Sequence, residues 1–212
     1  MKIQNKLSIA ILTSLGLGAT SFSAQAIQEG DMFMRLTATQ VAPNDDSTGF
    51  TNNTTLFPSA DDSTTLGATF VYMMNNNLGL EVLASLPFEH DVTVAGLGKV
   101  GTTKQLPPTI SVQYHFSPEA KFRPFVAAGL NYTIFFNDTL DASVGVGTDL
   151  ELDNSFGLAA QVGFDYDIDE KWFVSADIRY ISIETTASKA ILGTSDIDVN
   201  PTVISIGMGY KF

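Results

Sequence analysis

Few residues in this sequence could do acid–base or nucleophilic chemistry. It contains two histidines, His90 and His115, and no cysteine, which excludes thiolate catalysis, disulfides and cysteine-based metal sites. A serine nucleophile needs a base within hydrogen-bond reach. Ser85 and His90 are an odd number of positions apart, so on a regular strand they point to opposite faces. The sequence therefore favours a solvated His90 on a loop, an interfacial or lumenal His115, no enzymatic activity and no cofactor.

Acidic residues form a second group, because carboxylate oxygens are ligands for Ca²⁺ and Mg²⁺. They cluster at Asp45–Asp46, Asp61–Asp62 and Asp149–Asp153. None of these clusters follows a calcium-loop pattern, so a solvated acidic surface is favoured and no metal site is predicted. The chain has 23 acids against 11 bases, a formal charge of −12 and no basic cluster, which argues against nucleic acid as a partner.

The elements that would position these side chains are strands. Segments of about ten residues alternate between apolar residues and small or polar ones, the period-2 pattern of β-structure. The pattern is clearest near the C-terminus, where Ile204, Ile206, Met208, Tyr210 and Phe212 all lie on one face. Eight strands are predicted, at 31–41, 65–74, 78–88, 106–116, 122–136, 156–166, 172–180 and 203–212.

Residues 1–26 are predicted to be a secretory signal peptide. Lys2 and Lys6 precede an uncharged apolar run, and Ala24-Gln25-Ala26 offers a cleavage site with small residues at both ends. The apolar run is too short for a transmembrane helix, which needs about 20 apolar residues. We therefore expect export, cleavage after Ala26 and a single mature domain of residues 27–212.

The connections between the predicted strands alternate in length. Short turns follow the second, fourth and sixth strands, whereas longer polar stretches at about 43–63, 90–104, 137–154 and 187–198 follow the others. This alternation is typical of outer-membrane barrels, and aromatic residues beside the short turns suit a membrane interface. We predict an all-β fold, an eight-stranded antiparallel transmembrane β-barrel. A soluble sandwich or lipocalin-like barrel is the alternative, but its outward face would carry more charge.

The alternation also assigns charged side chains to the lumen. The inward charges form one predicted network of seven residues: Arg35, Glu81, Arg123, Asp165, Asp177, Arg179 and Lys211. Because an isolated buried charge is costly, these residues must pair or stay hydrated. We interpret them as a polar plug on the periplasmic side, with a gate or polar conduit as the alternative. Side chains nearly fill the interior of eight strands, so a wide aqueous pore is not expected.

Apolar inward residues are expected nearer the long loops. Val71, Leu83, Phe135, Ile181 and Ile183 form either an apolar pocket open to the exterior or the ordinary filling of the barrel. Pro87, Pro107 and Pro108 lie on neighbouring strands and cannot donate ladder hydrogen bonds. They predict a local break in the barrel wall, a lateral exit toward lipid. The alternative is that they only end the pairing before the loop.

Several motifs resemble the OmpW family of outer membrane proteins. They include Leu106-Pro107-Pro108-Thr109, Gln113-Tyr114-His115-Phe116, Lys121-Phe122-Arg123-Pro124-Phe125, Gly129-Leu130-Asn131-Tyr132 and the closing Gly209-Tyr210-Lys211-Phe212. The resemblance covers essentially the whole mature chain. It implies an eight-stranded barrel with a narrow, largely hydrophobic lumen, associated with the passage of small apolar compounds. Leu83 matches a position that narrows the channel, whereas Arg179 stands where the family can hold an aromatic residue.

The sequence therefore predicts a narrow, largely hydrophobic channel in the Gram-negative outer membrane, with release of small apolar molecules sideways into the bilayer. The alternative is a filled barrel without transport, whose acidic loops bind partners or stabilise the surface. The expected partners are outer-membrane lipids and small hydrophobic solutes. Lipopolysaccharide is a further expected partner, and shared divalent cations between it and the acidic loops are the alternative to a solvated acidic surface. The barrel-insertion machinery would bind the C-terminal Phe212.

Overall fold

The computed structural model describes residues 26–44, 46–53, 55–94, 98–141, 151–189 and 192–212. Apart from Ala26, the predicted signal peptide lies outside the described residues, as do Asp45 and Asp149 of the acidic clusters. Every regular element in the described part of the chain is a β-strand. No helix long and apolar enough to cross a membrane occurs there.

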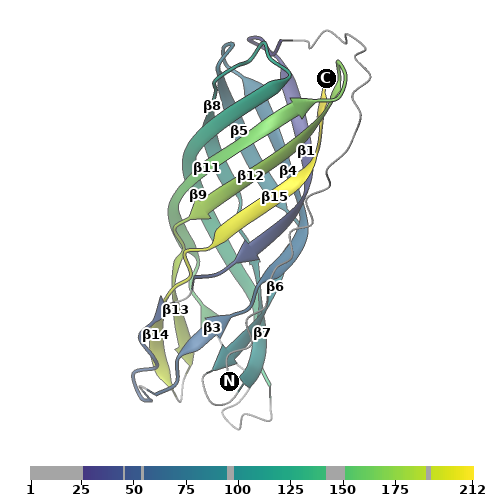
Figure 1. Cartoon of the computed structure of the whole chain (residues 1–212). Coiled ribbons are helices and arrows are strands. Elements are labelled where there is room, and N and C mark those ends of the chain that lie inside the picture. Colours follow the sequence, from purple (N-terminus) through teal and green to yellow (C-terminus); the bar gives the residue numbers. More distant parts are fainter. Residues whose placement is uncertain (1–25, 45, 54, 95–97, 142–150, 190–191) are drawn as a thin grey trace, which may run out of the picture.

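Eight strands close into an antiparallel barrel (Figure 1), which confirms the predicted fold. They are β1 (Met32–Ala42), β4 (Ser63–Met73), β5 (Leu78–Ser85), β8 (Thr109–His115), β9 (Phe122–Leu140), β11 (Ser155–Asp167), β12 (Trp172–Ile181) and β15 (Thr202–Lys211). Each pairs with the barrel strands before and after it, and β1 pairs with β15 to close the ring. Closure leaves no row of unpaired backbone groups facing lipid.

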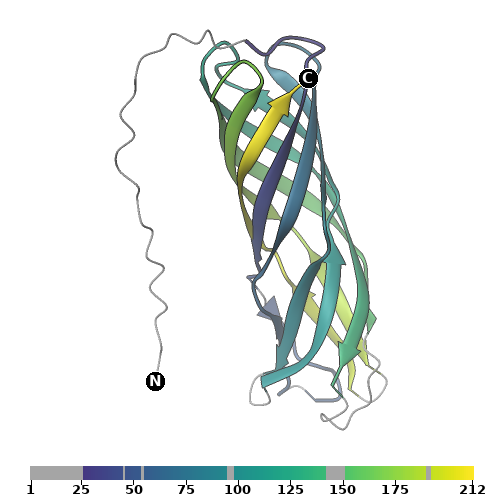
Figure 2. The ribbon, with the colours of Figure 1, turned by 90° about the vertical axis from the view of Figure 1, so that its right-hand side faces the viewer.

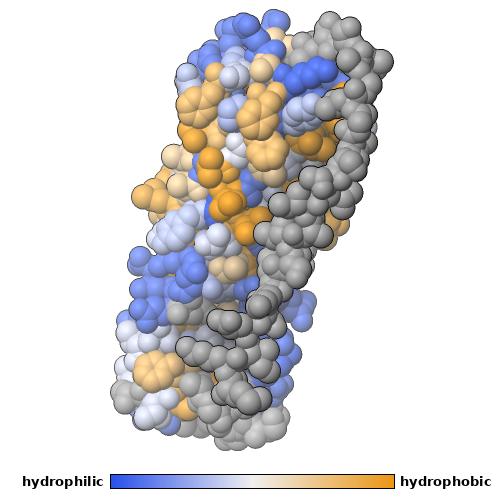
Figure 3. Space-filling model, in the orientation of Figure 1, coloured by the Kyte–Doolittle hydropathy of each residue, from blue (hydrophilic) through white to orange (hydrophobic). Residues whose placement is uncertain are grey.

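Side chains on the barrel strands alternate as predicted between a lumenal and an outer face. Leu36, Ile110, Phe156, Leu158 and Ile206 point outward and are more than half exposed. Figure 3 shows hydrophobic side chains gathered over the middle of the barrel, with hydrophilic ones above and below. An apolar outer surface around a polar lumen is the reverse of a soluble barrel, so this surface faces lipid.

An aromatic belt surrounds the barrel beside the short turns. Its close ring pairs include Tyr114–Phe116, Phe122–Phe164 and Trp172–Tyr210, with centroids 5.1, 5.3 and 4.9 Å apart. Tyr and Trp prefer the membrane–water interface because each combines an apolar ring with a polar group. The belt therefore marks one boundary of the membrane-spanning zone.

Beyond the other boundary the strands continue as two small sheets, which Figure 2 shows at the end opposite to the short turns. One sheet contains β3 (Pro58–Ala60), β6 (Phe88–Val94), β7 (Gly98–Leu106) and the end of β9. The other contains β2 (Asp46–Ser47), β10 (Glu151–Leu152), β13 (Glu184–Lys189) and β14 (Gly193–Asp198). The assignment of 90–104 and 187–198 to loops is therefore wrong, because glycines and charges conceal the short alternation there.

Candidate functional site

A hydrogen-bonded network of charges fills the lumen on the short-turn side. Arg35 on β1 donates from Nε and Nη2 to the two carboxylate oxygens of Asp165, at 3.0 and 2.8 Å. Glu81 on β5 accepts from Arg35 at 3.3 Å and from Arg179 at 2.8 Å. Gln113 bridges Arg35 and Glu81. Since these residues stand on different strands and are at most 2% exposed, the network ties the barrel wall together across the lumen.

A second ionic group lies closer to the short turns. Asp167 accepts hydrogen bonds from Arg123 and, at 2.8 Å, from Lys211. Asp167 was not predicted to be in the network because it directly precedes a turn, although its spacing of two from Asp165 places both on one face. Asp177 is also buried but forms no ion pair among the described residues. With Asp167 added to the predicted network, its acids and bases are equal in number.

An apolar cluster closes the short-turn end of the lumen. Ile27, Phe33, Val71, Met73 and Phe173 form it, each at most 2% exposed. The predicted position of Val71 in the loop-side lumen is wrong. Because β4 runs from the long loop toward a short turn, Val71 lies only two residues before the end of the strand and pairs with Phe33.

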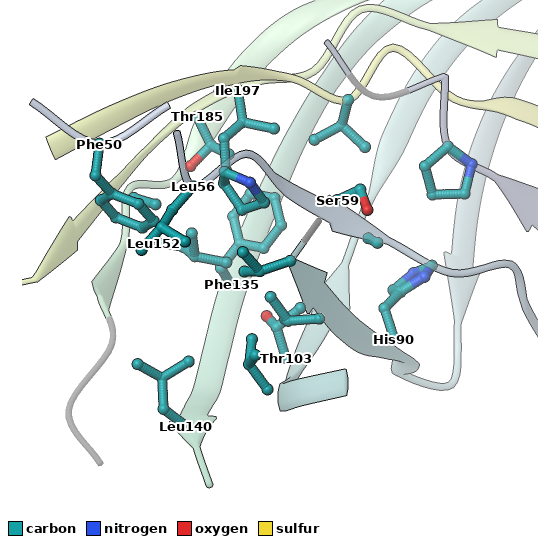
Figure 4. A pocket seen from close by; sticks show the side chains of 18 of the residues that line it. Phe50, Leu56, Ser59, His90, Thr103, Phe135, Leu140, Leu152, Thr185 and Ile197 are labelled. Carbon is teal, nitrogen blue, oxygen red and sulfur yellow. The ribbon is translucent and has the colours of Figure 1, made fainter. Parts of the chain in front are cut away.

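A cavity of about 370 Å³ lies between the two small sheets at the loop end (Figure 4). Its lining is mostly apolar and includes Phe50, Leu56, Leu152 and Phe135, the last a predicted apolar-path residue. Figure 4 shows Phe50 and Leu152 on one side of the pocket and His90 on the other. Two exposed residues, Asn53 and Ser59, also line it, and the cavity is not fully enclosed.

A second cavity, of only about 10 Å³, lies next to the first on the barrel side. It brings together Leu83, Ile181 and Ile183 of the predicted apolar path, with Phe88 and Pro107 beside them. A space of this size holds about one water molecule. Packed apolar side chains therefore close the lumen at this level.

Strand pairing in the barrel wall is interrupted where the predicted prolines lie. β5 pairs with β8 as far as Leu83 and Thr109, and pairing resumes between β6 and β7 at Phe88 and Gln105. Pro87, Pro107 and Pro108 lie in the gap and supply no N–H groups. Beside them, Leu86 is 58% exposed on the apolar outer surface. The interruption therefore adjoins both the lipid-facing wall and the small cavity.

Comparison with known proteins identifies the family of this chain. The OmpW family model matches residues 28–212. The chain belongs to the OmpW family. It is 42% identical to Outer membrane protein W of Vibrio cholerae over 96% of this chain and 97% of that protein.

The chain is also similar to two proteins of Pseudomonas aeruginosa. The crystal structure of the outer membrane protein OprG from Pseudomonas aeruginosa has a TM-score of 0.84 at 35% identity, covering 89% of this chain and 99% of that one. The dibenzothiophene metabolism operon protein PahQ of Pseudomonas aeruginosa is 30% identical over 72% of this chain and 74% of that protein. The Vibrio relative and OprG are both named as outer membrane proteins, which confirms the predicted location in the Gram-negative outer membrane.

Arg179 lines neither the large nor the small cavity. Its guanidinium instead donates to Glu81 within the ionic network. Leu83 does line the small cavity. The two side chains therefore act at different levels of the lumen, and Arg179 does not contribute to the apolar constriction.

His90 does not lie on a solvated loop as predicted, because it belongs to β6 and is 2% exposed. Its Nδ1 lies 2.6 Å from the carbonyl oxygen of Asp61 and its Nε2 lies 2.8 Å from Nε2 of Gln105. Both ring nitrogens are thus engaged, and Ser85 is not one of their partners. Burial lowers the pKa of His90, against the opposing effect of the Asp61 carbonyl and the Asp61 and Asp62 carboxylates.

The remaining candidates are His115, the acidic clusters and the C-terminus. His115 lies in the lumen, with its ring 6.0 Å from that of Phe33 and 5.4 Å from that of Phe125. Among the described residues no group of three or more His, Cys, Asp or Glu could hold a metal ion. Phe212 is 70% exposed at the short-turn end, and its recognition by the insertion machinery stays a prediction.

Proposed function

We propose that this barrel is a channel, not an enzyme, and that it gives small apolar molecules a route from the exterior into the outer-membrane bilayer. The contrast between the 370 Å³ apolar cavity and the ionic network carries the proposal. The cavity is not fully enclosed and could take up an apolar solute. The network would oppose its onward passage, because separating buried ion pairs leaves uncompensated charges. The route therefore turns aside before the network.

The proposed exit is the interrupted wall at Pro87, Pro107 and Pro108. Leu83 and Ile181 line the small cavity, which shares Gln105 with the large cavity and includes Pro107 of this interruption in its lining. Because the wall lacks ladder hydrogen bonds there, separating its strands locally costs less than elsewhere in the barrel. The exposed Leu86 beside the prolines offers an apolar surface that continues into lipid.

Such a route would let apolar solutes bypass the polar lipopolysaccharide layer of the outer membrane. An apolar solute crosses lipopolysaccharide slowly, because it must displace hydrated sugars and phosphates, and a protein-lined path avoids that step. PahQ, the relative named for a dibenzothiophene metabolism operon, supports an uncharged aromatic compound as the solute class. We propose the same class, small and apolar, for this chain.

The test places a charge in the small cavity. Leu83→Arg is expected to slow uptake by about tenfold or more, because a buried guanidinium costs several kcal/mol unless it is paired and it occupies the path. Leu83→Met is the matched control, since it keeps the volume and apolar character, and it is expected to take up solute like the unsubstituted chain. Uptake is measured with vesicles that carry lipopolysaccharide in the outer leaflet, using an apolar dye that fluoresces in hydrocarbon and a sugar of similar size.

Each result has one interpretation once circular dichroism and heat-dependent gel mobility show that the barrel is folded. Dye uptake without sugar uptake, lost in Leu83→Arg, supports the apolar route. Undiminished dye uptake in Leu83→Arg overturns the proposed path. Absence of uptake in the unsubstituted barrel would favour the filled barrel without transport, whose loops bind partners.

A further inference from the structure

A polar side chain lies at the junction of the two apolar cavities. Gln105 on β7 lines both of them and is only 2% exposed. In the strand register it stands between Phe88 on β6 and Phe135 on β9. Burying an amide among aromatic side chains costs free energy unless its polar atoms are hydrogen-bonded. The partners of Gln105 therefore decide what this position does.

The hydrogen bonds of His90 determine the orientation of the Gln105 amide. A carbonyl oxygen only accepts, so His90 Nδ1, at 2.6 Å from the oxygen of Asp61, carries the hydrogen. In the neutral ring Nε2 is then an acceptor, and Gln105 Nε2 donates to it at 2.8 Å. Burial lowers the pKa of His90 and so favours this neutral form. The amide nitrogen of Gln105 is therefore fixed toward His90.

The carbonyl oxygen of the same amide has no hydrogen-bond donor among the described residues. Gln105 Oε1 is buried and accepts no hydrogen bond from any residue that the structure describes. Other polar side chains around the large cavity are engaged. Thr103 donates to a carboxylate oxygen of Asp138, and Thr185 donates to the carbonyl oxygen of Asp153. Gln105 thus provides an unused buried acceptor in a mostly apolar lining.

We propose that Gln105 makes the cavity selective for apolar molecules that carry a single hydrogen-bond donor, such as phenols, fatty alcohols and aromatic N–H compounds. The apolar body would occupy the space between the two small sheets, and the hydroxyl or N–H would donate to Oε1. This inference rests on the proposed function, since it names the solute class of the same cavity.

Access to the acceptor requires a small side-chain movement. Gln105 Oε1 is covered by its neighbours, and Phe88 stacks on His90 with ring centroids 6.4 Å apart and an interplanar angle of 29°. Phe88 lines the small cavity beside Gln105. The proposal requires that a side chain beside Gln105, such as Phe88, moves to admit the solute to Oε1. A donor-bearing solute would then bind on the route itself.

The experiment compares two probes of nearly equal shape, 2-naphthol and 2-methoxynaphthalene, of which only the first has a donor. Binding is measured by equilibrium dialysis against the full barrel in nanodiscs, with empty nanodiscs as the background. The unsubstituted barrel is expected to bind 2-naphthol about 3- to 10-fold more tightly, the effect of one neutral hydrogen bond. Gln105→Leu is expected to remove this preference.

Gln161→Leu is the matched control. Gln161 on β11 also has a buried Oε1 without a partner among the described residues, but it lines neither cavity. The preference for 2-naphthol is expected to survive this substitution. Loss of the preference in Gln161→Leu to the same extent would overturn a specific role for Gln105.

The outcomes separate this inference from the proposed function. Equal binding of both probes by the unsubstituted barrel, or a preference that persists in Gln105→Leu, overturns the donor selectivity and leaves the apolar route standing. Binding of neither probe by the folded barrel overturns the apolar cavity as a solute site, and with it the proposed function. Since the comparison of probes needs no variant, the test holds even where Gln105→Leu fails to fold.

Discussion

The lumen of this barrel is closed in two different ways along its length. On the short-turn side, Arg35 donates to both Glu81 and Asp165 across continuous, fully paired strands. On the loop side, the lumen is closed by apolar packing around Leu83 and Phe88, beside a wall whose pairing is interrupted. The outer surface is apolar on both sides of this division, so lipid does not impose the difference.

The two closures differ in how easily an apolar solute can displace them. Moving an apolar side chain such as Phe88 sacrifices packing contacts, which an entering apolar solute replaces with contacts of its own. Parting Arg35 from Asp165 leaves two buried charges, which an apolar solute cannot compensate. Under the proposed function, the half closed by Arg35, Glu81 and Asp165 (the ionic half) acts as a seal. The half closed by Leu83 and Phe88 (the apolar half) acts as a passage, although the same strands build both.

The largest expected effect comes from breaking the ionic half. Glu81→Ala removes the acceptor of Arg179 and one partner of Arg35, and is expected to lower the free energy of unfolding by about 3–5 kcal/mol, because it leaves buried positive charge uncompensated. Glu89→Ala is the control on β6, since its ion pair with Lys104 is solvent-exposed and is worth about 0–1 kcal/mol. The free energy of unfolding of each variant would be measured by urea titration in lipid vesicles.

Similar losses in Glu81→Ala and Glu89→Ala would show that water, not Arg35 and Arg179, solvates Glu81 in the lumen. The ionic network would then not close the lumen more tightly than the apolar packing does. If solute instead passed along the barrel axis in the Glu81→Ala variant, this result would support the inference that the intact network blocks that path.

The sequence was sufficient for the barrel because period-2 alternation reports directly on which face each residue occupies. Arg35, Glu81 and Arg179 were assigned to the lumen in this way, and the structure places all three there. Alternation says nothing about height along the barrel, which depends on strand direction. Val71 was therefore assigned to the correct face at the wrong end.

The large cavity could not be derived in the same way. Its walls come from β6, β7 and short strands such as β3, whose hydrophobic positions are too few for a clear period, and from pairings between distant segments. His90 was taken for a solvated residue for the same reason. The role of Gln105 depends on the tautomer of His90 and on the Asp61 carbonyl, which are properties of the folded chain alone.

A smaller effect is expected from repairing the wall of the apolar half. Replacing both Pro107 and Pro108 by Ala restores two N–H groups that could pair with the neighbouring strand. Uptake of the apolar dye is expected to fall about 3- to 10-fold, the equivalent of about one extra hydrogen bond to be broken at the exit. Binding of 2-methoxynaphthalene in the cavity is expected to stay the same.

Pro124→Ala is the control for this wall experiment, because Pro124 lies on β9 in the ionic half and pairs with Phe164, away from both cavities. It is expected to leave dye uptake unchanged. Unchanged uptake in the Pro107→Ala, Pro108→Ala double variant, while Leu83→Arg still blocks it, would place the exit elsewhere in the wall.

The smallest expected effect is a dependence of stability on pH that originates in the apolar half. In the unfolded chain histidine has a pKa of about 6.5, and burial lowers the pKa of His90 in the folded barrel. As the pH falls below about 6.5, the unfolded chain binds the proton first, so the free energy of unfolding declines until the pH passes the folded pKa. The decline is at most about 1.4 kcal/mol per pH unit, the limit for one proton.

His90→Gln isolates this contribution, because glutamine does not titrate and its amide can still bond to Gln105. The quantity to measure is the free energy of unfolding of the unsubstituted barrel minus that of the variant, by urea titration between about pH 7.5 and about pH 5. This difference is expected to shrink as the pH falls, since only the unsubstituted barrel loses stability through His90. A difference that stays constant would mean that the ring is hydrated when charged, and that the apolar half is wetter than its lining indicates.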